Sequence, residues 1–145
     1  MAAEQGTEPV LEVRDLVKRF PVRSGLFGRG ESYVHAVDGV SFAVRQGETL
    51  GLVGESGCGK STIGRTVVRL IEPTEGQILL GGDDITRLNN RRLRPYRRRM
   101  QIVFQDPFAS LNPRMTVGDT IREVLAVHRL ASGQGAEMRV RELLQ

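Results

Sequence analysis

One short loop carries the strongest chemical signal in the sequence. Residues 54–61 read GESGCGKS, which fits the pattern GxxxxGK[ST], and Thr62 follows. Glycines in such a loop let the backbone curl so that successive N–H groups point at phosphate oxygens, and the positive end of a following helix adds to the attraction. The lysine ammonium reaches the β- and γ-phosphates and the serine hydroxyl binds Mg²⁺. The residues expected to hold a nucleotide here are Gly54, Ser56, Gly57, Cys58, Gly59, Lys60, Ser61 and Thr62.

The use of lysine in this loop is itself informative. Of the 21 basic residues 19 are arginine, and only Lys18 and Lys60 are lysine. A compact ammonium on a thin stem fits between phosphates where a broad guanidinium does not, so Lys60 is expected to serve catalysis as well as binding. The thiol of Cys58 is not expected to react, because no histidine is marked as its partner. A glycine-rich turn before an ordinary helix is the alternative interpretation of the loop.

The elements around the loop follow from apolar periodicity. Strands are predicted where apolar residues alternate or form short runs, over 10–20, 40–44, 49–53, 77–80 and 101–104. The runs 49–53 and 101–104 are expected to be buried parallel strands, residues 21–33 a loop, and 81–99 a polar connection with at most a short helix. A first helix is predicted directly after the glycine-rich loop, because apolar residues recur at helical spacing from Ile63 to Ile71. A second is predicted to begin at Thr116, which forms a capping box with Asp119, and a third to begin near Ala136 after a glycine-rich link.

Composition and charge exclude several classes of protein. The apolar content is ordinary for a globular domain, no run approaches the roughly 18 apolar residues of a membrane span, and the first residues do not resemble a signal peptide. A single cysteine excludes an internal disulfide framework.

The positive charge of the chain is concentrated in one segment. Residues 85–105 hold seven arginines and no acid, so the rest of the chain has a net charge of −3 although the whole carries +4. With one aromatic, Tyr96, this segment is expected to be a solvated face; a nucleic-acid-binding module is the alternative.

Two motifs together resemble a known family. GESGCGKST and the later QIVFQDPFASLNPRMTVGDTI look like the nucleotide-binding subunits of ABC transporters, and in particular the oligopeptide and dipeptide import ATPases. The resemblance runs from about Leu11 to the last residue. It implies an α/β fold with a P-loop core of mainly parallel strands and an N-terminal antiparallel β element. The core would span about 10–115, and about 116–145 would begin a helical subdomain.

The resemblance also implies roles for particular residues. Phe20 matches the aromatic on which adenine stacks, and Gln105 matches a glutamine that reaches Mg²⁺ and the attacking water, a metal-binding and catalytic role. Residues 106–115, with Phe108 and Leu111 as apolar contacts, match the loop that faces the membrane permease. The implied activity is Mg²⁺-dependent ATP binding and hydrolysis coupled to uptake of a peptide or related small solute, at the cytoplasmic face of the membrane. Further implied partners are a second ATP-binding subunit and, indirectly, a solute-binding protein.

Some of the family's hydrolytic elements are missing from the sequence. No apolar strand ends in Asp-Glu, no LSGGQ loop is present, and neither His35 nor His128 fits the switch position. Residues 131–135, ASGQG, share only composition with the signature loop and are interpreted as an inter-helix linker. The pair Asp83 and Asp84 is interpreted as part of a turn. Because the last helix meets no stop signal before residue 145, the sequence is expected to be cut short and unable to hydrolyse ATP alone. A small nucleotide kinase or a GTPase is an alternative function for the chain; such a protein would share with it only the phosphate-binding loop at residues 54–61.

Overall fold

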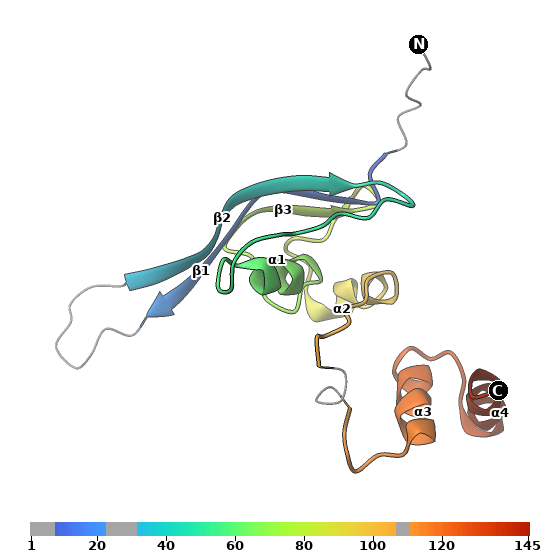
Figure 1. Cartoon of the computed structure of the whole chain (residues 1–145). Coiled ribbons are helices and arrows are strands. Elements are labelled where there is room, and N and C mark those ends of the chain that lie inside the picture. Colours follow the sequence, from blue (N-terminus) through green and yellow to red (C-terminus); the bar gives the residue numbers. More distant parts are fainter. Residues whose placement is uncertain (1–7, 23–31, 107–110) are drawn as a thin grey trace. The chain divides into compact units, whose positions relative to one another are not determined.

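An antiparallel sheet frames the first part of the chain. The computed structural model describes residues 8–22, 32–106 and 111–145, and separates two units, Met1–Ile102 and Val103–Gln145. In the first unit the strands β1 (Leu11–Val22), β2 (Ser32–Val44), β3 (Glu75–Leu80) and β4 (Asp83–Asp84) lie in the order β2-β1-β3-β4, and all neighbours are antiparallel. Figure 1 shows β1 and β2 as a long twisted ribbon. The expected N-terminal antiparallel element is therefore present.

The β1–β2 ribbon is longer than the sequence suggested. Pro21 pairs with Tyr33 and Val22 with Ser32, so parts of the expected 21–33 loop are strand; residues 23–31 lie outside the described residues. Proline is tolerated here because β3 pairs with β1 only as far as Val17, and the outer edge of β1 therefore needs no donor at position 21.

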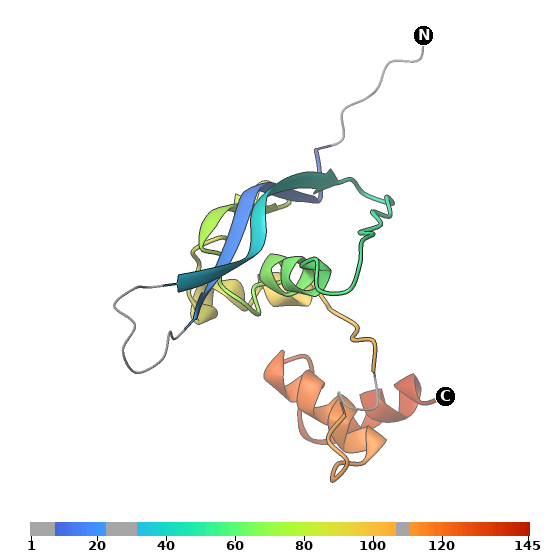
Figure 2. The same ribbon diagram turned by 60° about the vertical axis from the view of Figure 1, so that its left-hand side comes forward.

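The core of the first unit lies between the sheet and α1 (Lys60–Val67), which packs against one face of β1 and β2 (Figures 1 and 2). Apolar side chains from the sheet, from α1 and from the connection after β4 form one buried cluster: Val13, Leu16, Val37, Ile63, Val67, Ile78, Leu80, Ile85 and Leu93. Two short helical segments, α2 (Asn90–Leu93) and η1 (Tyr96–Arg98), complete the unit, where the sequence analysis expected at most one short helix within 81–99. Asp83 and Asp84, interpreted as part of a turn, form the short strand β4, because their backbone pairs with Leu79 and Leu80. The seven arginines of 85–105 are all exposed, as expected of a solvated face.

Helix α1 is shorter than predicted, and Arg69 is the reason. This residue adopts φ 57°, and the N–H groups of Arg69 and Leu70 bond back to the carbonyls of Thr66 and Arg65 at 3.0 and 2.9 Å. That pattern is a Schellman ending, normally made by glycine. The buried guanidinium donates to the Ile85 and Leu88 carbonyls at 3.1 and 3.3 Å, which holds the left-handed residue in place. Burial lowers the pKa of Arg69, and Glu72 partly opposes that effect.

The two expected parallel strands are not formed, which corrects that part of the sequence analysis. Residues 49–53 and 101–104 carry no strand pairing. Val53 is 97% exposed and Val103 is 90% exposed, so neither run is buried. A parallel strand exists only where a neighbour accepts its ladder of hydrogen bonds, and none of the described strands pairs with these segments. The two segments have the apolar composition of buried strands, but the described residues contain no strand that pairs with either of them.

The second unit is a helical hairpin. Helices α3 (Val117–Val127) and α4 (Gly133–Leu143) pack through Leu125, Ala136 and Val140. Helix α4 begins three residues before the expected Ala136, so part of 131–135 is helix rather than linker. Gly133, the first residue of α4, has φ 54°, a left-handed conformation that glycine adopts without steric strain. His128 ends α3 and is partly buried, as expected.

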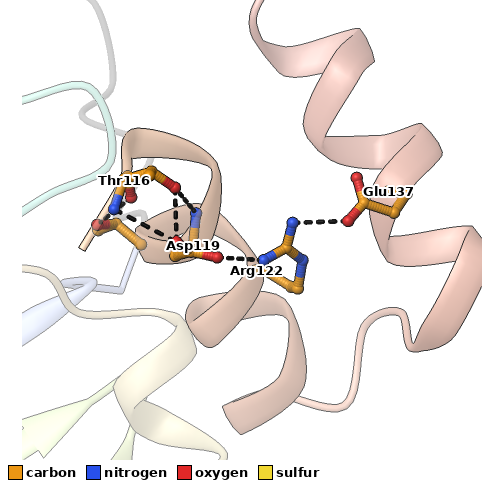
Figure 3. Close-up of polar contacts among 5 residues, drawn as sticks. Thr116, Asp119, Arg122 and Glu137 are labelled. Atoms are coloured by element: carbon orange, nitrogen blue, oxygen red, sulfur yellow. Dashed lines mark hydrogen bonds and ion pairs between the residues drawn. The ribbon is translucent and has the colours of Figure 1, made fainter.

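The N-terminus of α3 confirms the capping box. The Asp119 N–H donates to Thr116 Oγ1 at 3.1 Å, and Asp119 Oδ2 accepts from the Thr116 N–H at 3.4 Å and from its hydroxyl at 2.6 Å. Figure 3 shows that Arg122 continues this network, pairing with Asp119 and, at 2.6 Å, with Glu137 of α4. The Thr116 hydroxyl and then Arg122 lower the pKa of Asp119. The network thus links the cap of one helix to the side of the next.

Candidate functional site

The loop that precedes α1 is fixed against β2 by a glycine. Gly59 has φ 97°, and a Cβ built on it would lie 2.3 Å from the carbonyl oxygen of Ala36 and 4.0 Å from Val37 Cγ2. Any side chain at this position would therefore collide with the β2 backbone. Gly57 also has a positive φ of 85° but has no atom within 4 Å of the corresponding Cβ position. One glycine anchors the loop to the sheet, and the other leaves open space above it.

The first turn of α1 is suited to an anion. The helix begins at Lys60 with Gly59 as its N-cap; no side chain caps it and no acidic residue lies in its first turn. The first N–H groups of a helix have no intrahelical acceptor, and their dipoles make this end positive. Ser61 is exposed and Thr62 is half-buried in the same turn, so hydroxyl groups accompany the backbone donors.

The ammonium of Lys60 lies within the loop. Its Nζ donates to the carbonyl oxygens of Gly54 and Glu55, both at 2.6 Å, and lies 3.3 Å from Cys58 Sγ. The Cys58 thiol is free and exposed. These neighbours are neutral, and among the described residues Lys60 forms no ion pair that would compensate its charge. The side chain therefore has no part in the core, and its positive charge remains available to an anion at the loop.

Phe20 lies on β1 in the same unit. Its side chain is 37% exposed, so it is not the core residue that a strand position alone would suggest. The ammonium of Lys18 lies over the ring, 4.8 Å from its centroid. Sequence reasoning noted the rarity of Lys18 but missed this contact. The i, i+2 spacing on a predicted strand, which places both side chains on one face, was the available signal.

The remaining candidate residues belong to the second unit or to its loop. Gln105 is exposed, and its role at Mg²⁺ and water stays a prediction. Of the expected permease contacts, Leu111 is 53% exposed, whereas Phe108 lies outside the described residues. In the first unit, Asp83 accepts a hydrogen bond from the Tyr96 hydroxyl at 3.2 Å, and burial together with that carboxylate raises the pKa of Tyr96.

None of the helices in the described part of the chain is both long and apolar enough to cross a membrane. No group of three or more His, Cys, Asp or Glu side chains is arranged there to hold a metal ion.

Comparison with known proteins identifies the family. A family model described as ABC transporter matches residues 37–145, which is most of the chain and includes the whole loop and α1. The chain belongs to the ABC transporter family. Both motifs that suggested this family, the glycine-rich loop and the segment from Gln101 onward, lie within the matched region.

Individual members of the family are closely similar in sequence. The oligopeptide transport ATP-binding protein AppF of Bacillus subtilis (strain 168) is 56% identical over 138 residues, which cover 94% of this chain and 42% of AppF. The glutathione import ATP-binding protein GsiA of Escherichia coli (strain K12) is 54% identical over 138 residues, or 95% of this chain and 22% of GsiA. The chain thus spans less than half the length of these relatives.

Solved ABC structures share the fold. The ATP-binding cassette MJ0796, solved as a dimer in a post-hydrolysis state bound to ADP and Pi, has a TM-score of 0.70 and 26% identity, and the match covers 91% of this chain and 54% of that one. A second dimeric structure of the same cassette gives a TM-score of 0.71 at 25% identity. The α/β assignment from sequence is confirmed by this likeness, apart from the two unpaired strands.

Proposed function

We propose that this ABC-family chain is the part of an importer's ATP-binding subunit that holds the phosphates of Mg-ATP. The observation that carries the proposal is the loop at residues 54–62, where an uncapped helix start, a glycine with open space and an ammonium free of acidic partners occur together. Relatives named as ATP-binding proteins and a structural neighbour bound to ADP and Pi support the choice of ligand.

The residues present fit the proposed ligand. Backbone N–H groups of the loop and the first turn of α1 would bind the phosphate oxygens, and Lys60 would exchange its carbonyl partners for the β- and γ-phosphates. The Ser61 hydroxyl would ligate Mg²⁺, which neutralises charge on the phosphates when bound. For Gln105, which belongs to the other unit, the Mg²⁺ contact is proposed from the family resemblance alone. Phe20, with an exposed ring, would stack on the adenine.

Hydrolysis and transport are proposed for the whole subunit. The sequence contains no apolar strand ending in Asp-Glu and no LSGGQ loop, so we expect these 145 residues alone to release no phosphate from ATP. General-base catalysis contributes about 10²–10⁴-fold in rate, and loss of electrostatic stabilisation removes more. Release of phosphate that depends on Lys60 would contradict this expectation.

The proposed cargo and partners come from the relatives. AppF is named for oligopeptide transport and GsiA for glutathione import, so the proposed cargo is a peptide or related small solute. At the cytoplasmic face of the membrane, this subunit would contact a permease through residues 106–115, and a second ATP-binding subunit would complete the dimer. A solute-binding protein would be an indirect partner.

The permease contact is tested with Leu111→Asp, which changes an exposed apolar side chain. This variant should impair co-purification with the permease while nucleotide affinity is retained. Unchanged co-purification would count against this contact.

The phosphate-binding proposal is tested by titration with a fluorescent ATP analogue in the presence of Mg²⁺. Lys60→Ala should lose most of the affinity, because the loop then has no cation for the β- and γ-phosphates. Its matched control is Arg65→Ala, which removes an exposed cation from the same helix away from the loop and should bind like the wild type. Equal affinity of the Lys60→Ala variant and the wild type would refute the proposal.

A further inference from the structure

Lys18 lies on the sheet face against which the phosphate loop packs. On β1 it pairs with Val37 of β2, and residues paired across antiparallel strands have side chains on the same face. Val37 is buried, and its Cγ2 is the side-chain atom that a Cβ on Gly59 would meet at 4.0 Å. Helix α1 packs against one face of β1 and β2 (Figures 1 and 2). The pairing with Val37 places Lys18 on that same face.

Phe20 continues the same face of β1, and Lys18 is in contact with it. The ammonium of Lys18 is 4.8 Å from the centroid of the Phe20 ring, so the two side chains lie on one side of β1 although the β1–β2 register shifts between Lys18 and Arg19. Among the described residues, Lys18 forms no hydrogen bond or ion pair, whereas its strand neighbours Arg14 and Arg19 are paired with Glu12 and Glu75. Its charge is therefore directed at the ring.

The Phe20 ring needs such a contact to keep one orientation. Phenylalanine has no hydroxyl with which to anchor itself, and this ring is exposed near the end of a two-stranded ribbon, where β3 no longer pairs with β1. A cation over one face of the ring favours the rotamer that keeps the contact, and the opposite face is then left for a flat ligand.

We propose that Lys18 is a positioning residue for the nucleobase: its ammonium holds the Phe20 ring so that a purine stacks on it while the triphosphate lies in the loop. This inference rests on the proposed function and adds a residue to it. The base then binds to a ring whose orientation is set before the ligand arrives. Less conformational entropy of the Phe20 side chain is therefore lost on stacking. Lys60 and Lys18, the two lysines of the chain, would serve the two ends of one nucleotide.

The test compares a ligand that has a base with one that lacks it. Lys18→Met keeps the length of the side chain but removes the charge, and it should weaken Mg-ATP about two- to fivefold while Mg-tripolyphosphate affinity is unchanged. Lys18→Arg retains a cation over the ring and should keep wild-type affinity for both ligands. In a Phe20→Ala background, Lys18→Met should have no further effect. Arg14→Met, which removes a cation of the same strand away from the ring, is the control for general electrostatics.

The outcomes separate this inference from the proposed function. If Lys18→Met weakens Mg-ATP and tripolyphosphate equally, its ammonium acts on the phosphates, and the positioning role is wrong. Unchanged or tighter ATP binding would overturn it as well. If Lys60→Ala leaves ATP affinity intact, the phosphate site itself fails. The thermal unfolding midpoint of each variant, followed by circular dichroism, shows whether a loss of affinity reflects loss of the fold, and Lys18→Arg provides the folded comparison.

Discussion

Replacing Gly59 by alanine tests how the phosphate loop is anchored to the sheet. The new Cβ would lie 2.3 Å from the Ala36 carbonyl oxygen, far inside van der Waals contact, and the residue would have to keep φ 97°. The left-handed conformation costs a non-glycine residue about 1–2 kcal/mol. Overpacking against a backbone atom that cannot rotate away adds about 1–3 kcal/mol. We therefore expect Gly59→Ala to lower the free energy of unfolding by about 2–5 kcal/mol.

Gly57→Ala is the matched control for this prediction. Gly57 has a similar φ of 85° but no atom within 4 Å of the new Cβ, so only the conformational cost of about 1–2 kcal/mol applies. Urea denaturation followed by far-UV circular dichroism gives the free energy of unfolding of both variants, which are compared at the same slope m of that free energy against urea concentration. The difference between them isolates the contact with Ala36. Equal losses of stability in the two variants would refute the proposed anchoring.

Three further predictions concern other parts of the chain. Alkylation of Cys58 by iodoacetamide should slow when Mg-ATP is added, because the exposed thiol lies in the loop; equal rates would count against that placement. The pKa of the Asp119 carboxyl is lowered in the folded chain, first of all by the Thr116 hydroxyl. The contribution of Asp119 to stability is therefore present above the carboxyl pKa of the unfolded chain, and it is lost as pH falls through the lower pKa of the folded chain. In an NMR titration, the Asp119 carboxyl of Thr116→Ala should titrate at higher pH than that of the wild type. Arg69→Met should lower the free energy of unfolding by about 1–3 kcal/mol in urea denaturation, because the buried Ile85 carbonyl and the half-buried Leu88 carbonyl lose their donor. The exposed control Arg91→Met should change it by less than about 0.5 kcal/mol.

Local sequence signals predicted elements that depend on residues close in the sequence, such as a helix whose capping residues lie within its first turn. The capping box of Thr116 and Asp119 is of this kind, whereas the antiparallel pairing of β1 with β2 was implied by the family resemblance. The signals failed where long-range pairing decides the structure. Residues 49–53 and 101–104 have strand composition, but no described strand pairs with them.

The candidate site shows the same division. The glycines and Lys60 of the loop were predicted from spacing alone, because backbone curvature and charge are local properties. The contact of Gly59 with Ala36 was not predictable, since it depends on how the loop packs against a strand more than 20 residues earlier in the sequence. The end of α1 was misplaced for a related reason. Arg69 takes a conformation that favours glycine, and only its buried contacts with distant carbonyls explain that choice.

Hydrogen–deuterium exchange of the backbone amides with and without Mg-ATP tests the central claim most directly. If residues 54–62 form the phosphate cradle, nucleotide should slow exchange there, because their N–H groups then donate to phosphate oxygens. The arginine-rich segment 87–99, the other concentration of positive charge, should show no change. Protection confined to 87–99, or no protection of 54–62 at saturating nucleotide, would contradict the account.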